Sequence, residues 1–125
     1  MSNVPVIAIV DDDESFRRAT VSFIRSLGYA TAAFASAEAF LHSDCGYDVD
    51  CLITDVQMPG MSGIQLQSHL LEQGRKLPII FVTAFSEIKA RGRAIAAGAV
   101  GFLDKPFGEE KLITCLNQAL AQRGA

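Results

Sequence analysis

The sequence predicts an α/β domain built on one doubly wound, five-stranded parallel sheet with helices on both faces. Two observations predict it. Short apolar runs without polar alternation occur five times in the 125 residues, as expected for strands buried on both sides. Helical patterns fill the intervals, and this alternation favours right-handed crossovers. A closed eight-unit barrel needs about 200 residues or more, so we expect one open-sheet domain over residues 1–125, with strand order 2-1-3-4-5.

Each apolar run is a predicted strand, and the runs are Val4–Val10, Ala30–Phe34, Val49–Thr54, Leu77–Val82 and Ala99–Leu103. Pro5 and Pro78 fall at the openings of their strands, where a missing N–H donor is tolerated. Ala30–Phe34 ends without a polar residue, and we place it at the edge of the sheet.

The first two helices precede and follow this edge strand. The first ends at Gly28 and carries one apolar stripe, made of Phe16, Ala19, Phe23, Ile24 and Leu27. A short second helix follows Ser36.

Capping signals mark the remaining helices. The third opens at Ser62, and Gln65 three residues later completes a capping-box pattern. The fourth spans about Ser86 to Ala97, and the last carries Leu112, Ile113, Leu116, Ala119 and Leu120 on one face. Glycines 28, 74 and 98 each follow a helical stretch, as is typical of helix C-termini.

Composition excludes several classes of protein. A net charge of −3 argues against direct nucleic-acid binding by this domain, which needs a clustered positive surface. The chain has no run of 18 apolar residues and no positively charged leader, so we expect a cytoplasmic protein without membrane contact. Cys45, Cys51 and Cys115 match no metal spacing and predict reduced thiols. His42 and His69, each alone on a helix, predict surface histidines.

Polar side chains gather where the predicted strands end. Asp11 and Asp12 follow the first strand, Asp55 the third and Thr83 the fourth, and Lys105 lies just past the fifth. The carboxyl ends of parallel strands share one edge of a sheet, where open α/β sheets place their sites. We therefore expect three carboxylates, a hydroxyl and an ammonium to converge there.

The acids predict a divalent metal site. Crowded carboxylates in a partly buried cleft repel one another, and a cation removes that penalty. Oxygen ligands suit Mg²⁺, or Mn²⁺ in its place. Asp13 and Glu14 need no metal, because acids are favoured at the start of a helix by its dipole.

At this point the chain is identified as a member of a known family. The segments "VDDDES", "LITDVQMPGMSG", "IIFVTAF" and "GAVGFLDKPF" resemble the receiver domains of bacterial two-component response regulators over essentially the whole length. These domains share the flavodoxin-like sheet order expected above. The last segment and "SAEAFL" are most similar to the FixJ-like group, whose receivers usually precede a helix-turn-helix DNA-binding domain. The resemblance therefore implies that "AQRGA" precedes such a domain in a longer regulator.

The resemblance also assigns roles to residues. Asp55 corresponds to the phosphoacceptor, and Asp11 and Asp12 to metal-binding acids, with Asp12 the direct ligand and Asp11 acting partly through water. The backbone carbonyl of Gln57 corresponds to a further metal ligand, and Asp55 itself also touches the metal. Thr83 and Phe102 correspond to the switch hydroxyl and switch aromatic, and Lys105 contacts the phosphoryl group. The Lys105–Pro106 bond is expected to be cis, although most X–Pro bonds are trans.

These roles imply a signalling switch rather than a turnover enzyme. A sensor histidine kinase, or a small acyl phosphate, would donate the phosphoryl group to Asp55 in a Mg²⁺-dependent reaction. The resemblance implies that Thr83 then moves, Phe102 turns inward, and the surface of the fourth helix, fifth strand and fifth helix changes the output, transcription. We expect the segment "KARGRA", with Lys89, Arg91 and Arg93, to border a phosphorylation-dependent homodimer or domain contact. Gly92 weakens that helix by about 1 kcal/mol relative to alanine.

Two alternatives from other classes remain open on the sequence. The first is a haloacid-dehalogenase-like phosphatase with Asp11 as nucleophile, since "DDDES" fits a D-x-D pattern. That class needs a later acidic pair, and here only Asp104 stands beside Lys105. The second is a flavin module of the same topology, but four acids in the first loop carry the wrong charge to cradle a phosphate.

Overall fold

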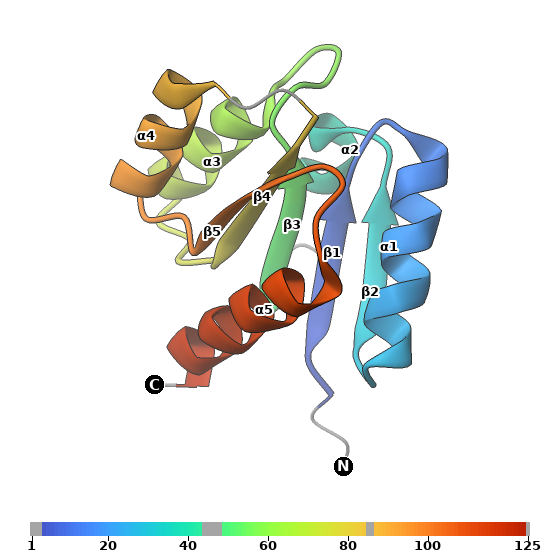
Figure 1. Cartoon of the computed structure of the whole chain (residues 1–125). Helices are drawn as coiled ribbons and strands as arrows, with labels where there is room; N and C mark the ends of the chain where they lie inside the picture. Colours follow the sequence, from blue (N-terminus) through green and yellow to red (C-terminus); the bar gives the residue numbers. More distant parts are fainter. Residues whose placement is uncertain (1–3, 44–48, 85–86, 125) are drawn as a thin grey trace.

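The computed structural model describes residues 4–43, 49–84 and 87–124. The strands are β1 Val6–Val10, β2 Ala30–Phe34, β3 Cys51–Asp55, β4 Ile79–Thr83 and β5 Gly101–Asp104. They form one parallel sheet in the order β2-β1-β3-β4-β5, which confirms the predicted doubly wound architecture (Figure 1).

Four of the five predicted strands begin two residues too early, and β3, β4 and β5 each extend one residue further than predicted. Pro5 and Pro78 have no N–H to give to the ladder, although their carbonyl oxygens accept bonds of 3.0 Å from Ala30 and 2.9 Å from Leu52. The amide of Ala99 donates to Ala94 instead, over 2.9 Å, and so belongs to the end of the preceding helix. The later strand ends make Asp55 and Thr83 the last residues of their strands.

The helices are α1 Glu14–Ser26, α2 Ala37–Leu41, α3 Gly63–Glu72, α4 Ile88–Ala96 and α5 Glu109–Gly124. The capping box of Ser62 and Gln65 is present at the start of α3, as predicted. The predicted terminal glycines are confirmed as well, because Gly28, Gly74 and Gly98 have φ of 96°, 73° and 100°. For α4 the predicted start at Ser86 lies outside the described residues, and the helix begins after Glu87, whose side chain makes no capping bond. None of the helices formed by the described residues is long and apolar enough to cross a membrane.

Helices cover both faces of the sheet. In Figure 1, α1 and α5 lie on the near face, and α2, α3 and α4 lie behind the strands. Side chains alternate along each strand, so Ile53 packs toward α1 and α5 while Leu52 packs toward the other three helices. The two apolar layers hold the strands rigidly, and their carboxyl ends point to the upper edge in Figure 1.

The predicted apolar stripe of α1 is wrong at two positions. Ala19 and Leu27 are exposed, whereas Ile24 and Thr20 are buried. Thr20 tolerates burial because its hydroxyl donates a 2.8 Å bond to the carbonyl of Phe16. The buried face of α1 is therefore shifted from the predicted stripe, toward Thr20 and the partly buried Val21.

Candidate functional site

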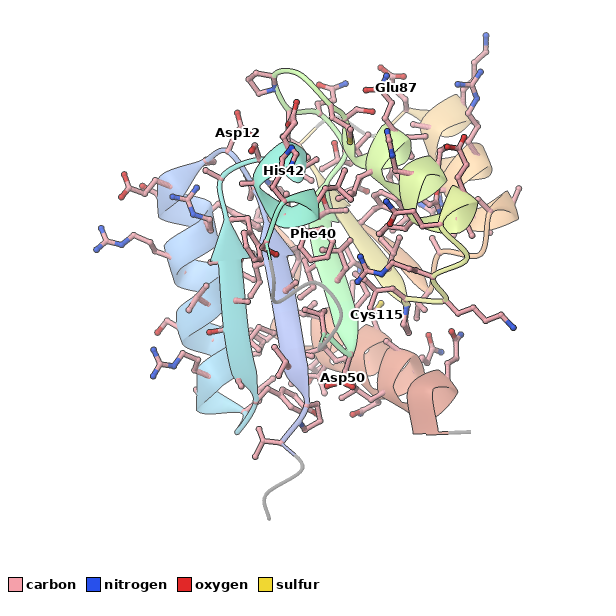
Figure 2. All side chains as sticks on the ribbon, turned by 180° about the vertical axis from the view of Figure 1, so that it is seen from behind. Asp12, Phe40, His42, Asp50, Glu87 and Cys115 are labelled. Atoms are coloured by element: carbon pink, nitrogen blue, oxygen red, sulfur yellow. The ribbon has the colours of Figure 1, made fainter. Side chains whose placement is uncertain are left out.

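The acids of the first loop meet the end of β3 at the upper edge of the sheet. Val10 lies opposite Thr54 in the register, so Asp11 and Asp55 emerge side by side. Both side chains are buried. Figure 2 shows Asp12 at this edge and Asp50 at the opposite end of the strands. The predicted convergence of the three carboxylates is confirmed.

Lys105 joins the two buried acids. Its Nζ donates hydrogen bonds of 2.8 Å to Asp11 Oδ2 and 3.1 Å to Asp55 Oδ2. The backbone amide of Lys105 donates to the carbonyl of Thr83 over 2.7 Å, which fixes the residue at the end of β4. The peptide bond from Lys105 to Pro106 is cis, as the resemblance implied. A residue 94 positions from Asp11 in sequence thus completes the site.

The three carboxylates fit one metal ion. Asp11, Asp12 and Asp55 each offer an oxygen, and these oxygens all lie within 4.8 Å of one another. Both oxygens of Asp11 are already engaged, Oδ2 by Lys105 and Oδ1 by the amide of Asp13 over 2.9 Å. Asp12 is exposed and carries no such bond among the interactions that the structure describes. This difference fits Asp12 as the direct ligand and Asp11 as the indirect one.

The electrostatics of Asp55 and Lys105 are coupled. Burial raises the pKa of Asp55 above its ordinary value, and the hydrogen bond and charge of Lys105 oppose that rise. For Lys105, burial lowers the pKa, but the bonds to Asp11 and Asp55 outweigh it and leave the pKa raised. The lysine therefore stays charged and offsets part of the repulsion between the two carboxylates.

The loop after Asp55 is held from two sides. The amide of Gln57 donates a 3.3 Å bond to Asp55 Oδ1, and Glu38 of α2 accepts a 3.0 Å bond from the amide of Met61. Hydrogen bonds from its own backbone amide and from the amide of Met61 lower the pKa of Glu38. A side chain at Gly60 would reach within 2.5 Å of Glu38 Oε2, so the loop lies close against α2. Glu38 was not among the residues predicted for the site, although it lies in the segment "SAEAFL".

The two switch positions, Thr83 and Phe102, lie on β4 and β5, the two strands that follow β3 in the sheet. Thr83 is fully buried at the end of β4. Phe102 on β5 is also buried, 7% exposed, with its ring centroid 6.0 Å from that of Phe81. The guanidinium carbon of Arg91 on α4 lies 6.0 Å from the centre of the Phe102 ring. The ring therefore lies inside in this structure, whereas the resemblance implied that it turns inward on phosphorylation.

A comparison with protein-family models identifies the family to which the chain belongs. A model described as "Response regulator receiver domain" matches residues 7–117, nearly the whole chain. The chain belongs to the response regulator receiver family. Both alternatives from the sequence, the haloacid-dehalogenase-like phosphatase and the flavin module, are thereby disfavoured.

Individual proteins similar to this chain are also response regulators or transcriptional regulators. Response regulator protein TmoT of Ectopseudomonas mendocina is 44% identical over 92% of this chain and 52% of its own length. Transcriptional regulatory protein TdiR of Thauera aromatica is 37% identical over 95% of this chain and 52% of its own. The chain thus spans about half the length of the curated relatives it matches. The crystal structure of FixJ-N superimposes with a TM-score of 0.84 at 33% identity, covering 97% of this chain and 96% of that one. The similarity to the FixJ-like group is confirmed.

The residues predicted to lie outside the site do so. Asp13 accepts a 3.1 Å bond from the amide of Phe16 and caps α1, as expected for an acid at a helix start. His42 and His69 are exposed. Cys51 and Cys115 are buried free thiols, and Cys45 lies outside the described residues.

Proposed function

We propose that this receiver accepts one phosphoryl group on Asp55 from a phosphohistidine of a sensor histidine kinase, in a reaction that needs Mg²⁺ or Mn²⁺. The observation that carries the proposal is the arrangement of Asp55 beside Asp11, Asp12 and Lys105 at one edge of the sheet. Stoichiometric modification makes the chain a switch rather than a turnover enzyme.

The metal would be held by Asp11, Asp12, Asp55 and the backbone carbonyl of Gln57. When bound, the ion supplies positive charge to the transferring phosphoryl oxygens and brings donor and acceptor together. Carboxylate and carbonyl oxygens are the ligands that both ions prefer.

The chain's own residues then do three things. A carboxylate oxygen of Asp55 attacks phosphorus, the bond from phosphorus to the donor's ring nitrogen breaks, and that nitrogen keeps the electron pair. Lys105 stays within reach of the new acyl phosphate, because its ammonium already lies 3.1 Å from Asp55 Oδ2. The hydroxyl of Thr83 donates to a phosphoryl oxygen, which stabilises the charge that Lys105 leaves uncompensated.

The haloacid-dehalogenase-like alternative needs Asp11 as nucleophile. Asp11 is only 1% exposed, and each of its carboxylate oxygens already accepts a hydrogen bond. Both oxygens of Asp55 also accept hydrogen bonds, but these are longer, 3.3 Å from the amide of Gln57 and 3.1 Å from Lys105. Asp55 is also more exposed, at 7%, which favours it over Asp11 as the nucleophile.

The signal leaves, in this proposal, through α4, β5 and α5. A phosphoryl group adds roughly −1.5 to −2 charge, which draws Thr83 toward Asp55 and changes the packing of Phe102 against Arg91. On the outer side of α4, Ile88 is 90% exposed and Ile95, seven residues on, is 47% exposed. With Lys89, Arg91 and Arg93 they border a phosphorylation-dependent homodimer or domain contact. An apolar pair edged by cations is typical of a protein interface.

The output is proposed to be transcription. TdiR is named as a transcriptional regulatory protein, and this chain matches only about half of it. A DNA-binding domain following residue 125 would supply the missing half and would itself contact the DNA. The domain described here is acidic, with a net charge of −3. The whole protein would act in the cytoplasm, where the kinase domain and the DNA are found.

The test is uptake of one phosphoryl group from acetyl phosphate, read by intact mass with Mg²⁺ and with EDTA. The wild type should gain one group only with Mg²⁺, and Asp55→Asn should gain none. Asp104→Asn is the matched control, because Asp104 is exposed next to Lys105 and should label normally. Labelling of Asp55→Asn at the wild-type rate would remove the site assignment. Steady release of phosphate from a monoester would favour the phosphatase alternative.

A further inference from the structure

We propose that Phe16 of α1 is a positioning residue for Lys105, holding the ammonium of the lysine against Asp11 and Asp55 through the face of its ring. The consequence for phosphoryl transfer rests on the function proposed above. The placement of the lysine itself does not.

The ring and the two acids surround the ammonium. Lys105 Nζ lies 4.1 Å from the centroid of the Phe16 ring, well inside the range of about 6 Å over which a cation is attracted to an aromatic face. On its other side the same nitrogen donates to Asp11 at 2.8 Å and Asp55 at 3.1 Å. The lysine side chain is only 13% exposed. A ring that excludes water strengthens both the cation–π contact and the two ion pairs.

Two contacts fix the ring itself. The backbone amide of Phe16 donates a 3.1 Å hydrogen bond to Asp13 Oδ1, which anchors the residue in the first turn of α1. The ring of Phe107 meets that of Phe16 nearly edge-on, with centroids 5.7 Å apart and an interplanar angle of 84°. This edge-to-face geometry is one of the two that aromatic pairs prefer. The Phe16 face is therefore held in orientation independently of the lysine.

The contacts close on themselves. Asp11 accepts from the amide of Asp13, Asp13 caps the amide of Phe16, Phe16 faces Lys105, and Lys105 donates back to Asp11. Phe16, an uncharged side chain in the first turn of α1, thus contacts the segment after β5 at the site.

The ring matters because the carboxylate partner changes during the reaction. When Asp55 becomes an acyl phosphate it loses its own charge, and Lys105 must find the phosphoryl oxygens instead. Asp11 still accepts one hydrogen bond from Lys105, but a lysine has many rotamers and one bond leaves the ammonium free to pivot. The Phe16 face is unaffected by the state of Asp55, so it keeps the ammonium inside before and after transfer.

The competing interpretation is that Phe16 only fills the apolar layer beneath α1, where Phe16 and Phe23 are both partly buried. Phe16→Leu separates the two interpretations, because leucine keeps apolar volume and loses the aromatic face. Phe16→Tyr keeps the face and serves as the conservative rescue. Phe23→Leu is the matched control, the same change about two turns further along the same helix.

The first readout is NMR of Lys105. In the wild type the side-chain CεH₂ protons should be shifted upfield by the ring current. That shift should disappear in Phe16→Leu and persist in Phe16→Tyr and Phe23→Leu. A Lys105 signal that is the same in Phe16→Leu as in the wild type overturns the placement, whether or not the chain is ever phosphorylated.

The second readout is the rate of labelling by acetyl phosphate with Mg²⁺. Phe16→Leu should lower the maximal rate by about three- to tenfold, the size of a partly desolvated cation–π contact, and leave the half-saturating concentration unchanged. Phe16→Tyr and Phe23→Leu should label like the wild type. An unchanged maximal rate in Phe16→Leu, or an equal loss in Phe16→Tyr, overturns the positioning role. If Phe16→Leu does not fold, Phe107→Leu removes the ring that orients Phe16 and should lower the rate in the same direction. A wild type that never labels overturns the proposed function instead, and the NMR comparison still decides the placement.

Discussion

The side-chain amide of Gln67 donates a 3.1 Å hydrogen bond to the backbone carbonyl of Ala94, linking α3 to the last turn of α4. Gln67 is only 3% exposed. The same carbonyl also accepts the amide of Ala99 over 2.9 Å. Because α4 belongs to the surface proposed to carry the signal, this bond fixes the resting position of one of its ends.

We predict that Gln67→Leu lowers the free energy of unfolding by about 1 kcal/mol, the net value of one hydrogen bond, since Ala99 still satisfies the carbonyl. Gln67→Glu should cost about 3 kcal/mol, because an ionised carboxylate would be buried against a carbonyl oxygen with no proton to share. Urea denaturation measures both. Gln118→Glu, on the exposed side of α5, is the control and should change stability by less than about 0.5 kcal/mol. Equal stabilities for the two Glu variants would contradict this account of α4.

Gly63 is predicted to tolerate no side chain. A Cβ there would overlap the carbonyl oxygen of Asp55 and lie 3.2 Å from the ring of Phe81. Gly63→Ala should therefore destabilise the fold by about 2 kcal/mol or more and displace Asp55, because neither the backbone of Asp55 nor the packed ring of Phe81 can move without losing other contacts. Thermal unfolding and the backbone amide shifts of Asp55 check this. A variant with wild-type stability and shifts would show that the loop after β3 is looser than described.

Gly92 provides the opposite case. It lies exposed in the middle of α4, and no described atom outside its own helix backbone and chain neighbours lies within 4 Å of the position that a Cβ would take. Gly92→Ala should raise the free energy of unfolding by up to about 1 kcal/mol through helix propensity alone. It should also slow hydrogen exchange of the α4 amides. A fall in the urea midpoint would mean that the glycine serves a close contact rather than weakening the helix.

The buried thiol of Cys51 should lower the free energy of unfolding at alkaline pH. Burial, followed by the charges of Cys115 and Asp50, raises the pKa of its thiol from 9.0 to about 12. The folded chain therefore keeps a proton that the unfolded chain releases. The free energy of unfolding keeps its full value with respect to this thiol below pH 9 and falls as the pH rises from 9 toward 12. The slope should be about 1.4 kcal/mol per pH unit in that window. Urea denaturation across the window should give a shallower slope for Cys51→Ala, and parallel slopes would refute the assignment.

Local signals in the sequence were sufficient for much of the fold. The capping box at Ser62 and the glycines that end α1, α3 and α4 depend on neighbouring residues only, and all were predicted correctly. The predicted starts of β1 and β4 were too early because Pro5 and Pro78 have no N–H to donate to the ladder, and that of β5 because Ala99 belongs to the end of α4.

Some residues of the site could be predicted from the sequence, and others could not. Asp11, Asp55 and Lys105 were predicted because the strand order forces strand ends together, whatever their separation in sequence. Phe16 and Glu38 were missed because their roles depend on which way a side chain points across the fold. A phenylalanine in an apolar stripe predicts packing, and no sequence pattern indicates that its face meets an ammonium.

We propose that Asp11, Asp12 and Asp55 surround one cation. Paramagnetic broadening by Mn²⁺ in amide NMR spectra measures where a divalent ion binds. The signals of Asp12, Asp55 and Gln57 should broaden first, and Asp12→Asn should weaken the effect. Asp50, at the opposite end of the strands from Asp12, should be unaffected (Figure 2). Broadening centred elsewhere, or none with millimolar Mn²⁺, would contradict the proposal.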